Sequence, residues 1–86
     1  MKERAVFEAH SSCVLGLLFT RDSRTLISAG MDNVVRLWSV SDWGLVSTFE
    51  GHANSTKAVN GMAFSPDGRW LAVGAADRKI RVWEQG

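Results

Sequence analysis

The sequence predicts an all-β protein made of two similar four-stranded antiparallel sheets, and three observations support this prediction. An Asp precedes a Trp by six positions twice, at Asp32 and Trp38 and again, 45 positions later, at Asp77 and Trp83. Each copy closes with an apolar residue, Arg, an apolar residue and Trp. Short segments rich in Val, Leu, Ile, Thr and Phe alternate with turn signals, as in all-β folds. Repeats of about 40 to 45 residues are typical of propeller blades.

Each copy contains the same series of short apolar segments, whose residues favour strands. In the first copy the expected strands are residues 14–19, 25–30, 34–40 and 45–49. In the second copy they are residues 59–64, 70–74 and 79–84. Residues 4–8 precede the first copy and match residues 45–49, which predicts an additional outer strand.

A tight turn is predicted between the first two strands of each copy. Ser65-Pro66-Asp67-Gly68 is the stronger signal, because Pro presets φ at the second position and Gly accepts a positive φ. The first copy has Thr20-Arg21-Asp22-Ser23 instead, so Ser23 occupies a position that Gly fills without strain. We expect the first hairpin to be less stable than the second.

Several strands are apolar on both faces, most clearly residues 14–19, which read VLGLLF. This pattern is expected where a sheet is covered on both sides. It predicts blades stacked on blades. A small barrel or sandwich with two similar halves is the alternative.

Composition excludes several classes of protein. The chain has 86 residues, 45% of them apolar and 22% charged, and its net charge of +1 gives no sign of nucleic-acid binding. No apolar run approaches the roughly 18 residues of a membrane span, and no signal-peptide core follows Met1. We therefore expect a cytoplasmic protein that binds neither nucleic acid nor membrane. The one cysteine, Cys13, agrees with a reducing compartment, and no ligand spacing predicts a metal or another cofactor.

The repeated motifs resemble those of the WD-repeat β-propellers. In the first copy the matching residues are His10, Ser28, Asp32 and Trp38. In the second copy they are Gly51-His52, Phe64-Ser65-Pro66-Asp67-Gly68 and Ile80-Arg81-Val82-Trp83. The resemblance covers nearly the whole chain in two registered copies. Both copies depart from the Trp-Asp pair of the family, because Ser39 and Glu84 follow the tryptophans.

The resemblance implies blades of four strands, each with a hydrogen-bonded structural tetrad of His, Ser or Thr, Asp and Trp. The first blade would contain His10, Ser28, Asp32 and Trp38. The chemistry is consistent, since a buried indole N–H needs an acceptor and a hydroxyl can accept from it while donating to an imidazole. A carboxylate would hold the other imidazole nitrogen.

The second tetrad is incomplete. His52, Asp77 and Trp83 remain, but Val73 replaces the hydroxyl residue. The bridge between indole and imidazole is therefore absent, and we expect a less rigid blade.

Ser28, His10 and Asp32 are also the residue types of a nucleophilic triad, which would make the protein a hydrolase. The tetrad places Ser28 against Trp38 inside the sheet, where no substrate reaches it. We therefore expect no enzymatic activity.

The order of strands predicts a ring built from several chains. Residues 1–9 would form the outer strand of a neighbouring chain's last blade, residues 10–50 the first blade, and residues 51–86 a second blade without its own outer strand. Propellers close with about four to eight blades, and two blades alone leave apolar faces bare. We expect eight blades from four chains, with six blades from three chains as the alternative. The exchange would pair Ala5, Val6 and Phe7 with Ile80, Arg81, Val82 and Trp83.

The family resemblance implies a non-catalytic scaffold for protein–protein interaction, with an unidentified protein or peptide as partner. Candidate contacts on one face are Cys13, Met31, Asn54 and Lys57. On the opposite face Trp43 is a candidate anchor, with packing against the blade as its alternative. A purely structural self-assembling module is the second functional possibility, and a piece of a longer propeller is the rival origin.

Overall fold

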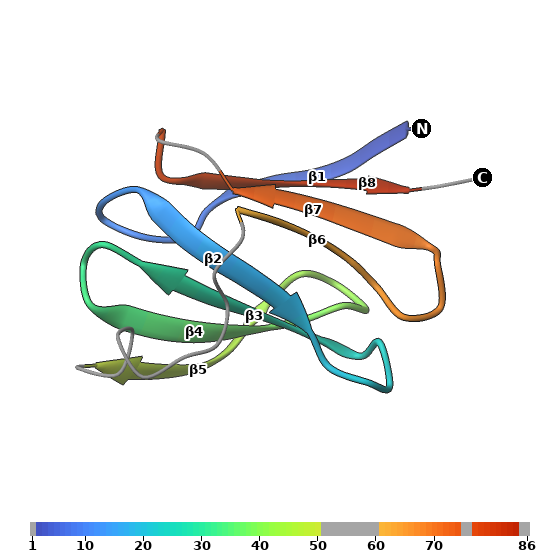
Figure 1. Ribbon diagram of the computed structural model, residues 1–86, viewed down its shortest axis with the longest axis horizontal. Coiled ribbons are helices and arrows are strands. Elements are labelled where there is room, and N and C mark those ends of the chain that lie inside the picture. Colours follow the sequence, from blue (N-terminus) through green and yellow to red (C-terminus); the bar gives the residue numbers. More distant parts are fainter. Residues whose placement is uncertain (1, 51–60, 75–76, 85–86) are drawn as a thin grey trace.

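Two four-stranded antiparallel sheets make up the fold, as the repeat predicts (Figure 1). This computed structural model describes residues 2–50, 61–74 and 77–84. The first sheet has the order β2-β3-β4-β5, with bounds Val14–Phe19, Thr25–Gly30, Val34–Ser39 and Leu45–Glu50. The second sheet has the order β1-β8-β7-β6, with bounds Lys2–Glu8, Lys79–Glu84, Trp70–Gly74 and Met62–Phe64. Within these described ranges no helix could cross a membrane.

The hydrophobic core lies between the two sheets. One layer comes from the first sheet and contains Leu17, Phe19, Leu26 and Trp38. The facing layer comes from the second sheet and contains Ala5, Phe7, Ala63, Ala72, Ile80 and Val82. The prediction of stacked sheets is thus confirmed, and burial of these side chains is what holds the two sheets together.

Gly74 in β7 allows the two sheets to approach closely. A Cβ atom built on Gly74 would lie 2.5 Å from Cγ1 and 2.8 Å from Cβ of Val14 in β2. Such distances are below any real carbon–carbon contact, so a side chain at this position would push β2 away from β7.

β1 pairs with β8 of the same chain, and the predicted exchange of this strand between chains stays a prediction. Residues 5–7 lie opposite residues 80–82 in an antiparallel register, as the complementary edges suggest. The crossover that follows is fixed to the same sheet, because Ala9 N donates to Arg78 O at 2.9 Å. Sequence complementarity shows which edges fit each other and does not show which chain supplies them. The second sheet therefore has its own fourth strand.

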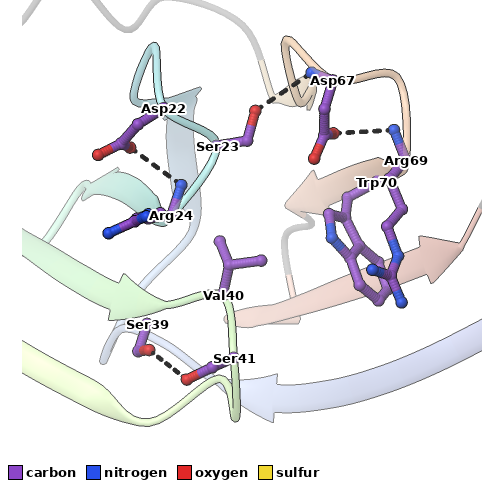
Figure 2. Close-up of a pocket in the computed structure, with 9 residues that line it drawn as sticks. All are labelled: Asp22, Ser23, Arg24, Ser39, Val40, Ser41, Asp67, Arg69 and Trp70. Atoms are coloured by element: carbon purple, nitrogen blue, oxygen red, sulfur yellow. Dashed lines mark hydrogen bonds between the residues drawn. The ribbon is translucent and has the colours of Figure 1, made fainter.

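The β2–β3 and β6–β7 turns have the same construction. Asp22 accepts from the Thr20 hydroxyl at 2.6 Å, and Asp67 accepts from the Ser65 hydroxyl at 2.5 Å. Ser23 has a φ of 59° where the second turn has Gly68 at 75°, so the predicted left-handed position of Ser23 is confirmed. Ser23 also links the two sheets, because its hydroxyl accepts from Asp67 N at 3.1 Å (Figure 2).

Trp43 lies between the sheets and is not a free anchor. Its ring is stacked near Phe7 at 6.4 Å and meets Trp70 edge-on at 5.3 Å, both measured between ring centroids. Phe7 in turn packs on Trp38 at 4.6 Å. These aromatic pairs join the outer strand β1 to both sheets, and packing is the role that the structure gives to Trp43.

Two substitutions of Ser23 separate its backbone strain from its hydrogen bond. Ser23→Ala removes the acceptor for Asp67 N and keeps the positive φ, whereas Ser23→Gly removes the acceptor and the strain together. We expect the Ala variant to be less stable than the Gly variant by about 1 kcal/mol, the cost of a left-handed conformation for a residue with a Cβ. Denaturant unfolding of both variants beside the wild type measures this difference. Equal stabilities would show that the turn relaxes when the hydroxyl is lost.

Candidate functional site

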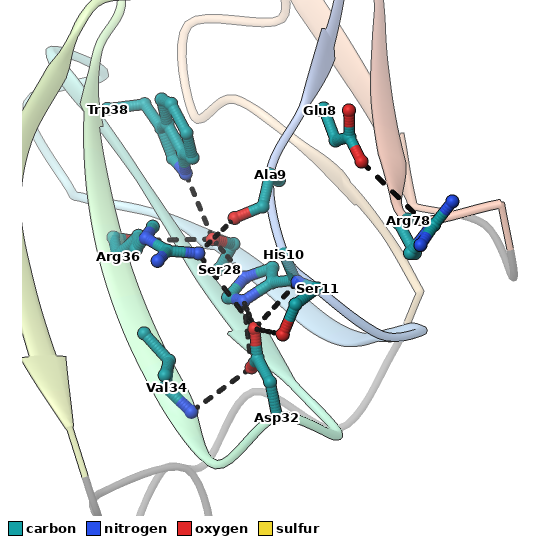
Figure 3. A network of polar contacts seen from close by, with 10 residues as sticks. All are labelled: Glu8, Ala9, His10, Ser11, Ser28, Asp32, Val34, Arg36, Trp38 and Arg78. Atoms are coloured by element: carbon teal, nitrogen blue, oxygen red, sulfur yellow. Dashed lines mark hydrogen bonds and ion pairs between the residues drawn. The ribbon is translucent and has the colours of Figure 1, made fainter.

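A chain of hydrogen bonds links four side chains of the first sheet and of the crossover from β1 to β2 (Figure 3). Trp38 Nε1 donates to Ser28 Oγ at 2.9 Å, and Ser28 Oγ lies 2.8 Å from His10 Nε2. His10 Nδ1 lies 3.1 Å from Asp32 Oδ1. The structure thus brings together all four residues of the first expected tetrad. Ser28 is fully buried, and only 3% of His10 is exposed.

Neutral His10 satisfies every donor of this network. With the proton on Nδ1, His10 donates to Asp32, and its Nε2 accepts from the Ser28 hydroxyl, whose oxygen accepts from the Trp38 indole. Burial lowers the pKa of His10 below its ordinary value of 6.5, and this effect outweighs the opposing attraction of the Asp32 carboxylate. The imidazole is therefore uncharged at pH 7.

Asp32 is an ionised carboxylate that fixes two chain segments. Burial acts to raise the pKa of Asp32, but donation from the Ser11 amide, His10 and the Val34 amide together holds it below the ordinary value of 3.8. Ser11 N lies 2.9 Å from Oδ2, and Val34 N lies 3.2 Å from Oδ1. One carboxylate therefore anchors both the β1–β2 crossover and the β3–β4 turn.

Arg36 and Gly30 complete the site, and neither residue was among those predicted for it. Arg36 Nη1 donates to Ala9 O at 2.6 Å and lies 3.9 Å from Asp32 Oδ2. A Cβ atom on Gly30 would lie 2.6 Å from Asp32 Oδ1 and from the His10 ring, so the network needs glycine there. The repeated Arg before each Trp was a signal for Arg36. The requirement at Gly30 is steric and has no counterpart in the repeat.

The distances among Ser28, His10 and Asp32 are those of a nucleophilic triad, but the surroundings do not suit catalysis. A nucleophilic hydroxyl must reach a substrate carbonyl. Ser28 Oγ is fully buried and accepts the Trp38 indole N–H, so it has neither access nor a free lone pair directed at a substrate. The geometry therefore supports a structural role for these residues. Among the described residues there is also no cluster of three or more His, Cys, Asp or Glu that could hold a metal ion.

The second sheet holds the equivalent positions in a different arrangement. Val73 lies opposite Arg81 in the same register in which Ser28 lies opposite Arg36. Asp77 accepts from Arg81 Nη2 at 2.8 Å and from Lys79 N at 3.2 Å, and both contacts are exposed. Trp83 is half-buried, in contrast to the buried Trp38. His52, the fourth expected member, lies outside the described residues.

The candidate partner residues are dispersed. Met31 stands on the β3–β4 turn with 62% of its surface exposed. Cys13 is half-buried, and its carbonyl accepts from Met31 N at 2.9 Å. Asn54 and Lys57 lie outside the described residues, and Trp43 packs between the sheets. Of the residues expected to contact a partner on this face, the structure therefore describes Met31 and its neighbour Cys13.

A groove of about 440 Å³ lies at the opposite end of the sheets, between three turns (Figure 2). Its apolar lining is Val40 and Trp70, and the Arg69 guanidinium covers the Trp70 ring at 4.8 Å. Arg69 Nε also donates to Glu84 Oε2 at 3.1 Å. Asp67 caps its own turn. Arg69 and Asp67 thus have partners within the chain, and the arrangement of the groove selects no particular ligand.

Comparison with known proteins identifies one family. The family described as "WD domain, G-beta repeat" matches residues 1–39 and 43–84. The chain is similar to "Anaphase-promoting complex subunit cdc20" of Dictyostelium discoideum, with 33% identity over 82 residues, which cover 92% of this chain and 16% of that protein. It is also similar to "WD repeat-containing protein 36" of Homo sapiens, with 40% identity over 68 residues, covering 79% of this chain and 7% of that protein.

Solved structures show the same relationship. "Crystal structure of RRP9 WD40 repeats" aligns with a TM-score of 0.54 and 26% identity, covering 96% of this chain and 26% of that one. "Structure of U3-55K" aligns with a TM-score of 0.53 and 28% identity, again over 26% of its chain. The chain therefore spans only a small part of the proteins that it resembles.

Acidification should destabilise the fold through His10. Because the pKa of His10 is lower in the folded than in the unfolded chain, the unfolded state binds more protons once the pH falls below about 6.5. The neutral imidazole makes its full contribution to the free energy of unfolding above that pH, and this contribution decreases below it. Protonation of Asp32 removes more stability at pH values below 3.8.

Denaturant unfolding at several pH values measures this dependence. In His10→Gln the free energy of unfolding should vary less between about pH 7 and about pH 5, and parallel curves would contradict the assignment.

Removing the Ser28 hydroxyl should be costly. Ser28→Ala leaves the buried Trp38 N–H without its acceptor, and an unsatisfied buried donor costs about 1–3 kcal/mol of unfolding free energy. Ser28→Thr keeps a hydroxyl and should lose less. Val73→Ala at the equivalent position of the second sheet removes no hydrogen bond and serves as the matched control. Chemical denaturation of all three variants measures the effect, and a Ser28→Ala variant as stable as the wild type would show that the hydroxyl contributes nothing.

Proposed function

Because this chain belongs to the WD40 repeat family, we propose that it is a rigid, non-catalytic scaffold for protein–protein interaction. The observation that carries this proposal is the use of the only triad-like constellation among the described residues as internal support. The Ser28 hydroxyl accepts a hydrogen bond from Trp38, and the Asp32 carboxylate accepts hydrogen bonds from backbone amides of the crossover and of the β3–β4 turn. A polar network of this kind rigidifies the chain, and its hydroxyl and carboxylate are already hydrogen-bonded within the described residues.

The same network supports a partner-binding role for the β3–β4 turn. Asp32 holds that turn by its contact with Val34 N, and Met31 stands beside it with its side chain in solvent. A flexible thioether on a fixed turn adapts to irregular apolar surfaces of a partner. The partner is a protein or peptide, and we place the interaction in the cytoplasm.

Assembly of several chains is the second part of the proposal. The two sheets leave large apolar side chains in solvent, including Leu18, Phe49, Met62 and Phe64. A ring of four copies would contain eight blades, and a ring of three copies would contain six. Since β1 completes the second sheet of its own chain, such a ring is formed by stacking of complete two-sheet units.

A purely structural module is the alternative, and the exposed apolar faces favour it. Such a module would associate through these faces and bind nothing else. Adjoining repeats of a longer chain would cover the faces equally well, since the relatives are much longer than this chain.

A variant of Met31 tests the scaffold role against this alternative. Met31→Ala should abolish retention of the bound partner when the immobilised chain is exposed to cell extract, because it removes the projecting side chain without touching the core. Arg21→Ala, in the β2–β3 turn at the other end of the sheet, is the matched control and should retain the partner. Trp43→Ala is unsuitable as a surface control, since Trp43 packs on Phe7 and Trp70. Identical sets of bound proteins for wild type and Met31→Ala would contradict the role of Met31, and a wild type that retains no protein specifically would favour the structural module.

A further inference from the structure

The two sheets meet through unlike faces. The first sheet contributes the face that carries Leu17, Phe19, Leu26 and Trp38. The second sheet contributes its opposite face, which carries Ala63, Ala72, Ile80 and Val82. Each sheet therefore uses a different side, and each retains one side that the other sheet does not cover.

The two sides that the other sheet does not cover are repeat equivalents of the two sides that meet in the interface. We define the first outer face as Leu18, Ile27, Leu37 and Phe49, whose strands are paired in register in the first sheet. These positions correspond to Ala63, Ala72, Val82 and Phe7 in the buried layer of the second sheet. We define the second outer face as Met62, Phe64, Leu71, Val73 and Trp83. These correspond to Leu17, Phe19, Leu26, Ser28 and Trp38 in the first sheet.

One aromatic pair makes the correspondence specific. Within the chain, Phe7 of an outer strand packs on Trp38 with centroids 4.6 Å apart. Phe49 lies opposite Val35 in the first sheet as Phe7 lies opposite Ile80 in the second, and 47% of its surface is exposed. Trp83, the repeat equivalent of Trp38, is half-buried on the second outer face. Both halves of a second Phe–Trp contact are thus present in the chain without being joined.

We propose that a second copy of this chain docks head to tail, with the first outer face of one copy on the second outer face of the next and Phe49 on Trp83. This inference rests on the proposed self-assembly and specifies its interface. It needs no exchange of strands, because β1 already completes the second sheet. The contact repeats the register of the interface within the chain, and apolar side chains again meet apolar side chains. Leu18 and Ile27 are larger than their equivalents Ala63 and Ala72. Burial of exposed aromatic and aliphatic side chains drives the association.

Two single-face variants test the direction of this contact. Phe49→Glu disables the first outer face, and Phe64→Glu disables the second, where 56% of Phe64 is exposed. By native mass spectrometry each variant alone should be a monomer of about the 9.5 kDa chain mass. An equimolar mixture should form a one-to-one dimer that does not grow, since each variant supplies the face that the other lacks. Thr48→Glu, on the other side of β5, should assemble like the wild type.

The outcomes separate this interface from the proposed assembly. Recovery of the dimer in the mixture supports the interface, and unfolded variants could not produce it. Dimers of Phe49→Glu alone, or a monomeric mixture while the wild type associates, would overturn the head-to-tail contact and leave self-assembly intact. A wild type that stays monomeric at every concentration would overturn the self-assembly itself and assign both faces to neighbouring repeats of a longer chain.

Discussion

Burial of the Trp38 indole between the two sheets is the interaction on which the other contacts depend. Its ring needs an apolar partner, and Phe7 provides one at 4.6 Å. Its N–H needs an acceptor, because an unpaired buried donor costs about 1–3 kcal/mol. Ser28 is that acceptor, and its hydroxyl determines where the His10 ring lies. Since His10 belongs to the crossover between β1 and β2, the Trp38 indole helps to fix the connection between β1 of the second sheet and β2 of the first.

The repeat made most of the fold predictable, because residues 45 positions apart occupy the same place in their sheets. The left-handed Ser23 was predictable for the same reason, since its counterpart is Gly68. Other features depend on three-dimensional neighbours. Complementary edges indicated that β1 pairs with β8 but not that both belong to one chain. The aromatic packing of Trp43 and the close approach of the His10 ring to Gly30 arise between segments that are distant in sequence, and no local pattern encodes them.

The two copies have diverged where the network is concerned, and this divergence has structural consequences. With Val73 in place of a hydroxyl residue, Trp83 has no equivalent of the Ser28 acceptor at that position of the described sheet. An indole N–H is then better served by solvent than by a dry core, which agrees with the half-buried position of Trp83. Asp77 binds Arg81 at the surface, whereas Asp32 is drawn into the crossover. The first sheet thus has a buried polar network at this position, whereas the ion pair of the second sheet lies at the surface.

An interface that joins two unlike faces of neighbouring sheets leaves two faces uncovered in any open stack of sheets. If each contact joins the Trp face of one sheet to the opposite face of another, two sheets satisfy one contact and leave one face of each kind uncovered. Adding sheets moves these faces apart without removing them until the last sheet meets the first. The apolar residues on both outer faces, Leu18 and Phe49 on one and Met62 and Phe64 on the other, are therefore a consequence of the repeat itself. A sequence that keeps large apolar side chains on both sides of every sheet is suited to a closed array of sheets and poorly suited to an isolated pair.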